Sequence, residues 1–227
     1  MGVIILDCET IDHKYNFICD LAWGLIDRNK MHTIKNYIVQ EHMAHMAEGS
    51  FSKPKMAATM AEVAAGRAII KPYSEIMAEL AEDMESARYV YAYNAQFDRD
   101  KTIKTCSALQ LPEFAEYFSQ SEIYDKWRDL WAWASNTILF KKSFIDFCEV
   151  HGLTTPKGFC STSAETTLKF IRNDPTYIEA HTALKDIQDE FEIYLTIKKQ
   201  MKREYQEICL DDEAQNFKGK PFYTIEK

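Results

Sequence analysis

Short apolar runs bounded by polar residues dominate the start of the chain. Residues 3–6 are apolar, mostly β-branched and followed directly by a carboxylate, which predicts a buried strand whose end reaches a site. Residues 21–26 and 34–39 predict two further strands, and the polar residues 27–30 between them predict a hairpin turn. We therefore expect an antiparallel meander at the start of the fold.

Beyond residue 72 the apolar residues recur mainly at helical spacing. The helix expected over residues 74–87 has Ser74 as a candidate N-cap and an apolar stripe along one face. Further helices are expected from about residue 99 to 109, and over residues 140–150, 162–171 and 182–206. Residues 89–93 predict a short strand, whereas the pattern over residues 124–139 fits either a strand or a helix.

Residues 41–72 differ in composition from the segments around them. They are rich in Ala, Met and Lys, with Pro54 and Gly66 as breaks, and we expect short helices on an insertion. No internal repeat and no linker rich in Pro, Gly or Ser divides the chain. The economical prediction is one α/β domain of mixed strands flanked by helices over residues 1–210, followed by a polar tail at 211–227.

The overall composition is that of an ordinary globular domain, since 46% of the 227 residues are hydrophobic and 27% are charged. No apolar run is long enough to span a membrane, and the apolar start lacks the basic segment and cleavage site of a signal peptide. The six cysteines form no C-x-x-C pair, so we expect a cytoplasmic protein with reduced thiols. Zinc at Cys148, His151 and Cys160 is disfavoured because no fourth ligand follows at a standard spacing.

Acidic residues outnumber basic ones, and the net charge is −8. This charge argues against a protein that coats nucleic acid electrostatically, unless several of the carboxylates hold divalent cations. Small basic clusters could hold phosphates, although each is more typical of a solvated helix face. These clusters are Arg99/Lys101/Lys104, Lys141/Lys142 and Lys198/Lys199/Lys202/Arg203.

Carboxylates stand at three places where predicted elements begin or end. Asp7 and Glu9 follow the first apolar run, and in a strand residues two apart point to the same face. Asp98 follows the predicted strand at 89–93, and Asp186 lies near the start of the last helix with His181 five residues before it. Five residues turn a helix by about 140°, so His181 can face Asp186 only from the first turn or the loop before it.

Four carboxylates suit Mg²⁺ or Mn²⁺ better than zinc, because these hard cations prefer oxygen ligands. Two such ions about 4 Å apart can activate a water and stabilise the leaving oxygen of a phosphoryl displacement, and a histidine can accept the proton of the water. Each piece alone has an ordinary explanation. A D-x-E sequence is common by chance, Asp98 alone could cap a helix, and His181 alone could be a surface or capping residue.

Taken together, three segments resemble the DEDDh subgroup of the DnaQ-like exonucleases. Residues 6–10, LDCET, resemble the D-x-E-T motif of that family. Residues 93–98, YNAQFD, resemble its second motif, in which an Asn and a Phe precede the Asp. Residues 181–186, HTALKD, resemble its third motif, with a His five residues before an Asp. The motifs occur in the order of the family and extend over nearly the whole chain.

The resemblance implies a ribonuclease H-like fold, with a five-stranded mixed sheet flanked by helices, and a 3′→5′ exonuclease that uses two Mg²⁺ or Mn²⁺ ions. It implies that Asp7 contacts both ions, that Glu9 and Asp186 hold the catalytic ion and that Asp98 supports the second. It also implies that His181 is the general base.

The same resemblance implies that Asn94 and Phe97 seat the terminal nucleotide and that Thr10 lies near the 3′ end. The insertion at 41–72 and the tryptophans Trp127, Trp131 and Trp133 are not part of the family pattern. The insertion and the tryptophans could shape a lid or a stacking platform for bases, although core packing fits the tryptophans better.

The implied substrate is the 3′ end of single-stranded DNA or RNA, and mononucleotides are the implied product. Two alternatives stay open: a non-catalytic module of the same fold that binds nucleic acid or protein, and an enzyme that acts on very short oligonucleotides. The sequence contains no polymerase or helicase domain, so any polymerase or repair partner is expected to be a separate chain. A homodimer is compatible with the sequence, and no membrane partner is expected.

Overall fold

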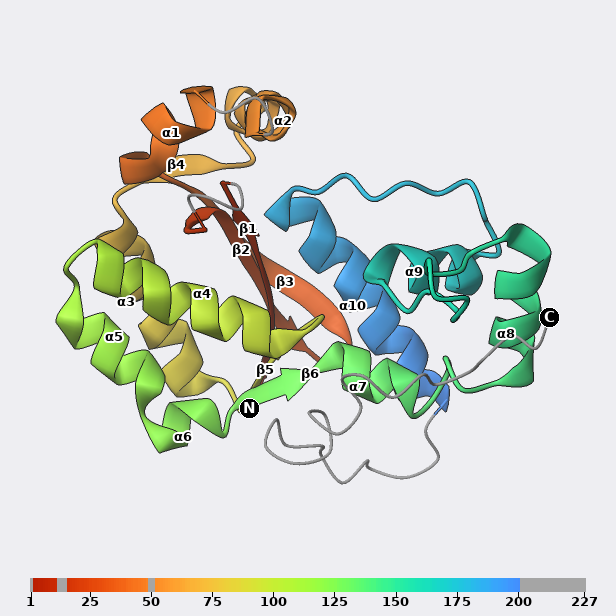
Figure 1. Cartoon of the computed structure of the whole chain (residues 1–227). Coiled ribbons are helices and arrows are strands. Elements are labelled where there is room, and N and C mark those ends of the chain that lie inside the picture. Colours follow the sequence, from red (N-terminus) through yellow and green to blue (C-terminus); the bar gives the residue numbers. More distant parts are fainter. Residues whose placement is uncertain (1, 12–15, 49–51, 201–227) are drawn as a thin grey trace.

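The computed structural model describes residues 2–11, 16–48 and 52–200, which form a mixed sheet with helices on both faces (Figure 1). The strand order across the six-stranded sheet is β4-β3-β2-β1-β5-β6. The strands are β1 (Val3–Thr10), β2 (Ile18–Asp27), β3 (Lys30–Val39), β4 (Ile69–Lys71), β5 (Tyr89–Ala92) and β6 (Trp127–Asp129). The α/β class with a mixed sheet, expected from the sequence, is confirmed.

Strands β1 to β3 form the predicted antiparallel meander. The turn between β2 and β3 has Arg28 and Asn29 at positive φ, 48° and 63°, which is the backbone of a tight hairpin turn. Strands β5 and β6 extend the sheet in parallel beyond β1, and β4 pairs in parallel with β3 at the opposite edge. The sheet thus has six strands where the resemblance implied five, because part of the 41–72 segment returns to the sheet as β4.

Helices cover both faces of the sheet. Figure 1 shows α3 to α6 on one face, and α10 with α7 to α9 on the other. The helices are α1 (Met43–Glu48), α2 (Ser52–Ala64), α3 (Tyr73–Ser86), α4 (Ala95–Ala108), α5 (Pro112–Ser119), α6 (Ser121–Tyr124), α7 (Leu130–Ser135), α8 (Lys142–His151), α9 (Ala164–Arg172) and α10 (Ala183–Gln200), with a 3-10 turn η1 (Gln40–His42) before α1. In the described part of the chain, no helix combines the length and apolar character needed to cross a membrane.

The central strand β1 divides the core into two layers by the alternation of its side chains. Ile4, Leu6 and Cys8 are buried with residues of α3 and the end of α4. Ile5 is buried on the other face, in the cluster that contains Ile187 of α10. Because successive side chains of a strand point to opposite faces, this alternation directs Asp7 and Glu9 to the face that α10 covers.

The ambiguous segment 124–139 contains both a strand and a helix, since β6 is followed directly by α7. Trp127 on β6 is fully buried in the α3 layer, so it packs in the core and cannot stack on a base. Trp133 stacks on Tyr91 with ring centroids 5.6 Å apart, and the indole N–H of Trp131 donates to the hydroxyl of Thr162 at 3.0 Å. The contacts of all three indoles are therefore internal ones, as core packing predicts.

The 41–72 segment forms η1, α1 and α2 before it joins the sheet at β4. Figure 1 shows α1 and α2 at one end of the sheet, near the start of α10. The predicted tail at 211–227 and the last predicted turns of the final helix, 201–206, lie outside the described residues, so the domain limits remain predictions.

Candidate active site

The acidic pair of β1 lies on the face of the sheet that α10 covers. Asp186, in the first turn of α10, is buried, and its charge acts on the carboxyl of Asp7 more strongly than any other charge. One carboxylate oxygen of Glu9, one of Asp186 and one ring nitrogen of His181 all lie within 4.8 Å of one another. Side chains about 170 positions apart in the sequence therefore meet at one place.

The start of α10 places His181 where it can face Asp186. His181 has φ +52°, in the left-handed region, and only Thr182 separates it from the first helical residue, Ala183. The backbone N–H of Ala183 donates to Oδ2 of Asp20 on β2 at 3.2 Å, which satisfies one of the unpaired donors at the helix start. The N–H of Asp186 donates to the carbonyl oxygen of Thr182 at 2.9 Å. His181 thus lies before the helix, an arrangement that the sequence spacing allowed.

Asp98 reaches the same strand from the opposite layer. It lies in the first turn of α4, and its Oδ1 accepts the backbone N–H of Cys8 at 3.0 Å. The N-cap position of α4 belongs to Asn94, which adopts φ +71°, so the alternative role of Asp98 as an N-cap is wrong. The backbone N–H of Asn94 donates to Oδ1 of Asp129 at 3.2 Å, which fixes the turn that presents Asp98.

Burial and mutual repulsion shift the acidity of the clustered carboxyls. Burial, followed by the charges of Asp186 and Asp98, raises the pKa of Asp7 well above its usual range. Burial, followed by the charges of Glu179 and Glu9, raises the pKa of Asp186 to about 9. Burial also raises the pKa of Asp98 to about 7, against the lowering effect of its hydrogen bonds from Cys8. Without a cation, these carboxyls tend to hold their protons.

The donor set fits a divalent cation. Among the described residues, Oδ2 of Asp7 and Oδ1 of Asp186 are buried and have no hydrogen-bond partner. Leaving buried polar atoms unsatisfied costs free energy, and a bound cation would both satisfy these oxygens and neutralise the repulsion between the carboxylates. Hard oxygen ligands of this kind favour Mg²⁺ or Mn²⁺.

A lysine from the 41–72 segment supplies positive charge to this cluster. The ammonium group of Lys55, on α2, forms an ion pair with the Glu9 carboxylate. The side chains of Lys55 and Glu9 are 23% and 15% exposed, so the pair is largely shielded from water. Burial lowers the pKa of Lys55, but the charge of Glu9 and the hydrogen bond to it outweigh this effect, so the pKa is raised. The sequence left open a lid formed by the 41–72 segment, but no motif or spacing indicated that Lys55 would be the residue to reach the candidate site.

Two acidic residues around the candidate site were not anticipated either. Asp20 faces Glu9 across the β1–β2 register, and burial raises its pKa to about 7. Glu190, one turn after Asp186 on α10, accepts the backbone N–H of Tyr93 at 3.0 Å, and its Oε2 has no hydrogen-bond partner within the described ranges. No sequence signal pointed to Asp20, because it lies in an apolar strand. Glu190 could have been predicted, because its i, i+4 spacing from Asp186 places the two on the same helix face.

The residues expected to seat a nucleotide lie beside the carboxylates in the chain. Phe97 is 39% exposed, next to the buried Asp98, and the ammonium of Lys101 lies 4.9 Å from the centre of its ring. Thr10 is half-buried at the end of β1, directly after the irregularity in register between Glu9 and Thr10. Asn94 is half-buried at the start of α4. The contact of these three residues with a substrate remains a prediction.

Comparisons with known proteins give the fold. No protein-family model matches the chain, and no curated protein matches its sequence. The zinc-ion-bound E. coli ExoI–ssDNA complex is 14% identical with a TM-score of 0.54, and the match covers 89% of this chain and 41% of that one. An ExoI/SSB-Ct complex is 12% identical with a TM-score of 0.54, covering 88% and 41%. Exonuclease X bound to 5′ overhanging duplex DNA is 14% identical with a TM-score of 0.46, covering 91% and 97%.

The two ExoI structures share the fold of this chain, and the expected α/β fold with a mixed sheet flanked by helices is confirmed. The match spans 41% of the length of each ExoI chain. At this level of identity the likeness is one of fold, and the chemistry of this chain has to be argued from its own residues.

Proposed function

We propose that the chain is a metal-dependent 3′→5′ exonuclease that removes mononucleotides from single-stranded nucleic acid. The observation that carries the proposal is that ligand atoms of Glu9, His181 and Asp186 lie within 4.8 Å of one another. The charges of Asp186, Asp98 and Glu9 also act on the neighbouring carboxyl of Asp7. Two of these residues have buried oxygens without a hydrogen-bond partner among the described residues. A purely structural cluster of this kind would only destabilise the fold, because buried carboxylates repel one another.

In the proposed reaction each residue acts through its position. Asp7, which lies among the other carboxylates, would help to hold both cations, Glu9 and Asp186 would hold the catalytic ion, and Asp98 would support the second. Two bound Mg²⁺ or Mn²⁺ ions would supply Lewis-acid activation of the attacking water and stabilisation of the leaving oxygen. His181, whose side chain is 59% exposed, accepts the proton of that water.

The proposed substrate end lies against the exposed ring of Phe97. An aromatic face stacks on any base, so this contact favours a terminal nucleotide without choosing its identity. Thr10 and Asn94 are proposed to contact the same nucleotide. Support for a single-stranded substrate comes from the ssDNA in the ExoI complex that shares the fold. The SSB-Ct in the other ExoI structure is compatible with a separate partner chain.

The proposal is tested with single-stranded DNA and RNA of matched sequence, labelled at the 5′ end. With Mg²⁺ or Mn²⁺ the label is expected to move through a ladder of fragments that become shorter by one nucleotide at a time. Excess EDTA is expected to stop the reaction. Oligomers of about 2, 5 and 20 nucleotides, compared by rate, separate a general exonuclease from an enzyme for very short oligonucleotides.

Variants distinguish catalysis at this site from a contaminating nuclease. Asp7→Asn and Asp186→Asn are expected to abolish activity, whereas His181→Ala is expected to slow it and leave metal binding intact. Asp27→Asn, at the exposed end of β2, is the matched control and is expected to retain full activity. Oligonucleotide binding without any shortening in either metal would show that the chain is instead a binding module.

A further inference from the structure

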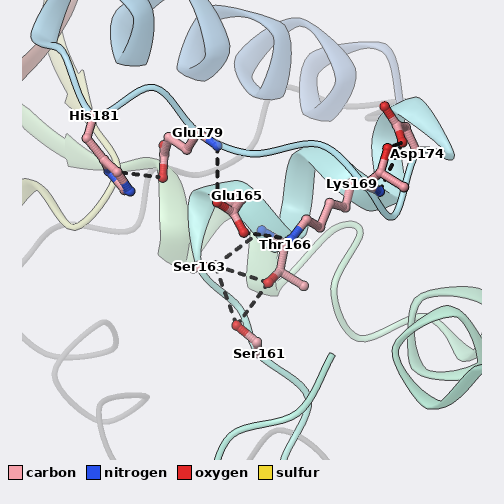
Figure 2. Close-up of polar contacts among 9 residues, drawn as sticks. Ser161, Ser163, Glu165, Thr166, Lys169, Asp174, Glu179 and His181 are labelled. Carbon is pink, nitrogen blue, oxygen red and sulfur yellow. Dashed lines mark hydrogen bonds and ion pairs between the residues drawn. The ribbon is translucent and has the colours of Figure 1, made fainter. Parts of the chain in front are cut away.

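The segment between α9 and α10 carries His181 and is fixed by side chains of both helices. Figure 2 shows Glu165, in the first turn of α9, as the anchor of this segment. Its Oε2 accepts the backbone N–H of Glu179 at 3.1 Å, and its Oε1 accepts from Lys169 at 2.6 Å. The hydroxyl of Tyr177 donates to the carboxylate of Asp189 on α10. The backbone at residue 179 is thus held in place shortly before the proposed general base.

The side chain of Glu179 turns toward the imidazole of His181. Its Oε2 lies 3.9 Å from Nδ1 of that ring, and Figure 2 shows the two side chains facing each other. Only 13% of the Glu179 side chain is exposed, against 59% of the His181 side chain. His181 belongs to two groups of possible metal ligands, one with Glu9 and Asp186 and the other with Glu165 and Glu179. The imidazole therefore lies between the proposed metal site and a second pair of carboxylates.

Glu179 occupies an unfavourable place for an acid. Burial raises its pKa, and the charges of Asp189, Glu165 and Glu9 raise it further. Among the charges that act most strongly on Glu179, that of His181 is the one that favours the ionised carboxylate. The ammonium of Lys169, a neighbouring cation, forms an ion pair with Glu165. Of these charges, that of the facing imidazole is therefore the one that stabilises the ionised form of the Glu179 carboxylate.

We propose that Glu179 is the positioning residue of the general base: it accepts a hydrogen bond from Nδ1–H of His181 and thereby leaves Nε2 free to accept the proton of the attacking water. The hydrogen bond of one ring nitrogen determines which tautomer an imidazole adopts. The inference rests on the proposed function for the role of His181, but the contact between the two side chains stands independently of it.

The distance of 3.9 Å is longer than a hydrogen bond of about 2.7–3.2 Å. Catalytic contacts are commonly loose before substrate binds and shorten in the complex, and the His181 ring is exposed enough to move. The competing role for Glu179 is that of a fifth carboxylate ligand, because its charge also acts on Asp186. Glu165 is a weaker candidate for either role, since both of its oxygens already accept hydrogen bonds.

The test compares Glu179→Gln with Glu149→Gln, an exposed residue of α8, as the matched control. Long-range ¹⁵N NMR of the metal-free protein at about pH 8, above the ordinary imidazole pKa of about 6.5, reports the His181 tautomer. The His181 signals are assigned by their loss in His181→Ala. We expect the Nδ1–H tautomer in the wild type and a shift toward the Nε2–H tautomer in Glu179→Gln, with no change in Glu149→Gln.

Kinetics and metal titration separate positioning from ligation. Glu179→Gln is expected to lower kcat by about 10- to 100-fold, the range for partners that orient a functional group, while KM stays within about twofold. Its Kd for Mn²⁺ is expected to stay within about twofold of the wild type. Glu179→Asp keeps the charge but draws it back by one methylene, and it is expected to retain more activity than Glu179→Gln.

Each other outcome overturns the inference. A loss of Mn²⁺ affinity in Glu179→Gln would show that Glu179 is a metal ligand. An unchanged tautomer together with an unchanged kcat would show that Glu179 does not orient His181. If Glu179→Gln does not fold, Glu179→Asp supplies the same two comparisons. A wild-type protein that never shortens a strand refutes the proposed function instead, and the NMR comparison still decides whether Glu179 determines the His181 tautomer.

Discussion

Asp7, Asp98 and Asp186 combine proximity to one another with burial, and burial is the largest cause of the raised pKa of each. In the metal-free protein such a group either keeps a buried charge or takes up a proton that it would release in the unfolded chain. Both alternatives cost free energy. The candidate site is therefore expected to lower the stability of the fold, and residues selected for function commonly have this effect.

The first prediction is that Asp7→Asn stabilises the metal-free protein. The amide has a similar shape and carries no charge, so the gain is expected to be about 1–3 kcal/mol. For a domain of this size each kcal/mol raises Tm by about 2–4 °C. Thermal unfolding in EDTA measures the gain. Added Mg²⁺ is expected to raise the Tm of the wild type but not that of Asp7→Asn, and an unchanged Tm in EDTA would contradict the prediction.

The second prediction concerns pH. The pKa of Asp98 is about 7 and that of Asp186 about 9 in the folded protein, both above the ordinary value of 3.8. At pH values between the ordinary pKa and the folded pKa of each group, the folded state binds more protons than the unfolded state. The stability present at low pH is therefore lost as pH rises through the two folded pKa values. Urea unfolding in EDTA at about pH 5, 7 and 9 is expected to give a falling free energy of unfolding.

Saturating Mn²⁺ is expected to flatten or reverse that pH dependence, because a bound cation favours the ionised carboxylates. Asp98→Asn, which removes one of the groups with a pKa of about 7, is expected to make the decline around pH 7 shallower, and Asp20, whose pKa is also about 7, accounts for the rest. A metal-free protein whose stability rises steadily over this window would show that the carboxyls are ionised and compensated by other groups.

At the scale of elements, the sequence predicted the parts of the candidate site that depend on local spacing. Asp7 and Glu9 share a face because β1 is a strand, and the position of His181 before α10 followed from the angle between residues five apart. The segment 124–139 could not be assigned because β6 has three residues and α7 has six, too few to establish either period.

The residues that complete the site depend on packing between distant elements. Asp20 contacts Ala183 across 163 positions, and Glu9 meets Lys55 across 46. No periodicity relates such residues, and a lysine in an Ala- and Met-rich helix looks like any solvated residue. Strand β4 was missed for the same reason, since its three residues become a strand only by pairing with β3. The acidic motifs predicted the residues at the centre of the candidate site, and only the structure shows the residues from other elements that contact them.

The third prediction follows from the contact of α2 with the site. Because the Lys55 ammonium pairs with Glu9, a cation that binds Glu9 has to displace it. Lys55→Met is therefore expected to tighten Mn²⁺ binding in the absence of nucleic acid. A pair of this exposure is worth about 1 kcal/mol, which is about a fivefold decrease in Kd. Titration followed by the EPR signal of free Mn²⁺ measures the change.

Lys53→Met is the matched control, because Lys53 lies on the same helix and is exposed. It is expected to leave the Mn²⁺ affinity unchanged. Weaker binding in Lys55→Met would mean that Lys55 organises the carboxylates for the cation and does not compete with it.

The whole molecule carries a net charge of −8, which opposes the approach of a polyanion. Positive charge is nonetheless found on α4, the helix that carries Phe97 and Asp98. The ammonium of Lys101 lies 4.9 Å from the ring of Phe97, and that of Lys104 lies 5.4 Å from the ring of Phe17. Burial, followed by the charge of Lys104, lowers the pKa of Lys101, so the two lysines repel each other. A phosphate between them would relieve this repulsion.

The fourth prediction is that these two lysines contact the strand that leads into the site. In single-stranded nucleic acid, each phosphate neutralised by the protein adds about 0.7 to the steepness of log K against log[salt]. Lys101→Ala combined with Lys104→Ala is therefore expected to make this slope shallower by about 1.4. Fluorescence anisotropy in an Asp7→Asn background measures the slope and prevents cleavage during the titration.

Lys141→Ala combined with Lys142→Ala is the matched control for charge, because Lys141 contacts Gln200 at the end of α10 opposite Asp186. This double variant removes the same two positive charges far along α10 from the carboxylates, so it is expected to leave the salt dependence close to that of the Asp7→Asn background. An equal change of slope in both double variants would mean that the substrate senses only total charge, and α4 would then have no particular role in guiding the strand.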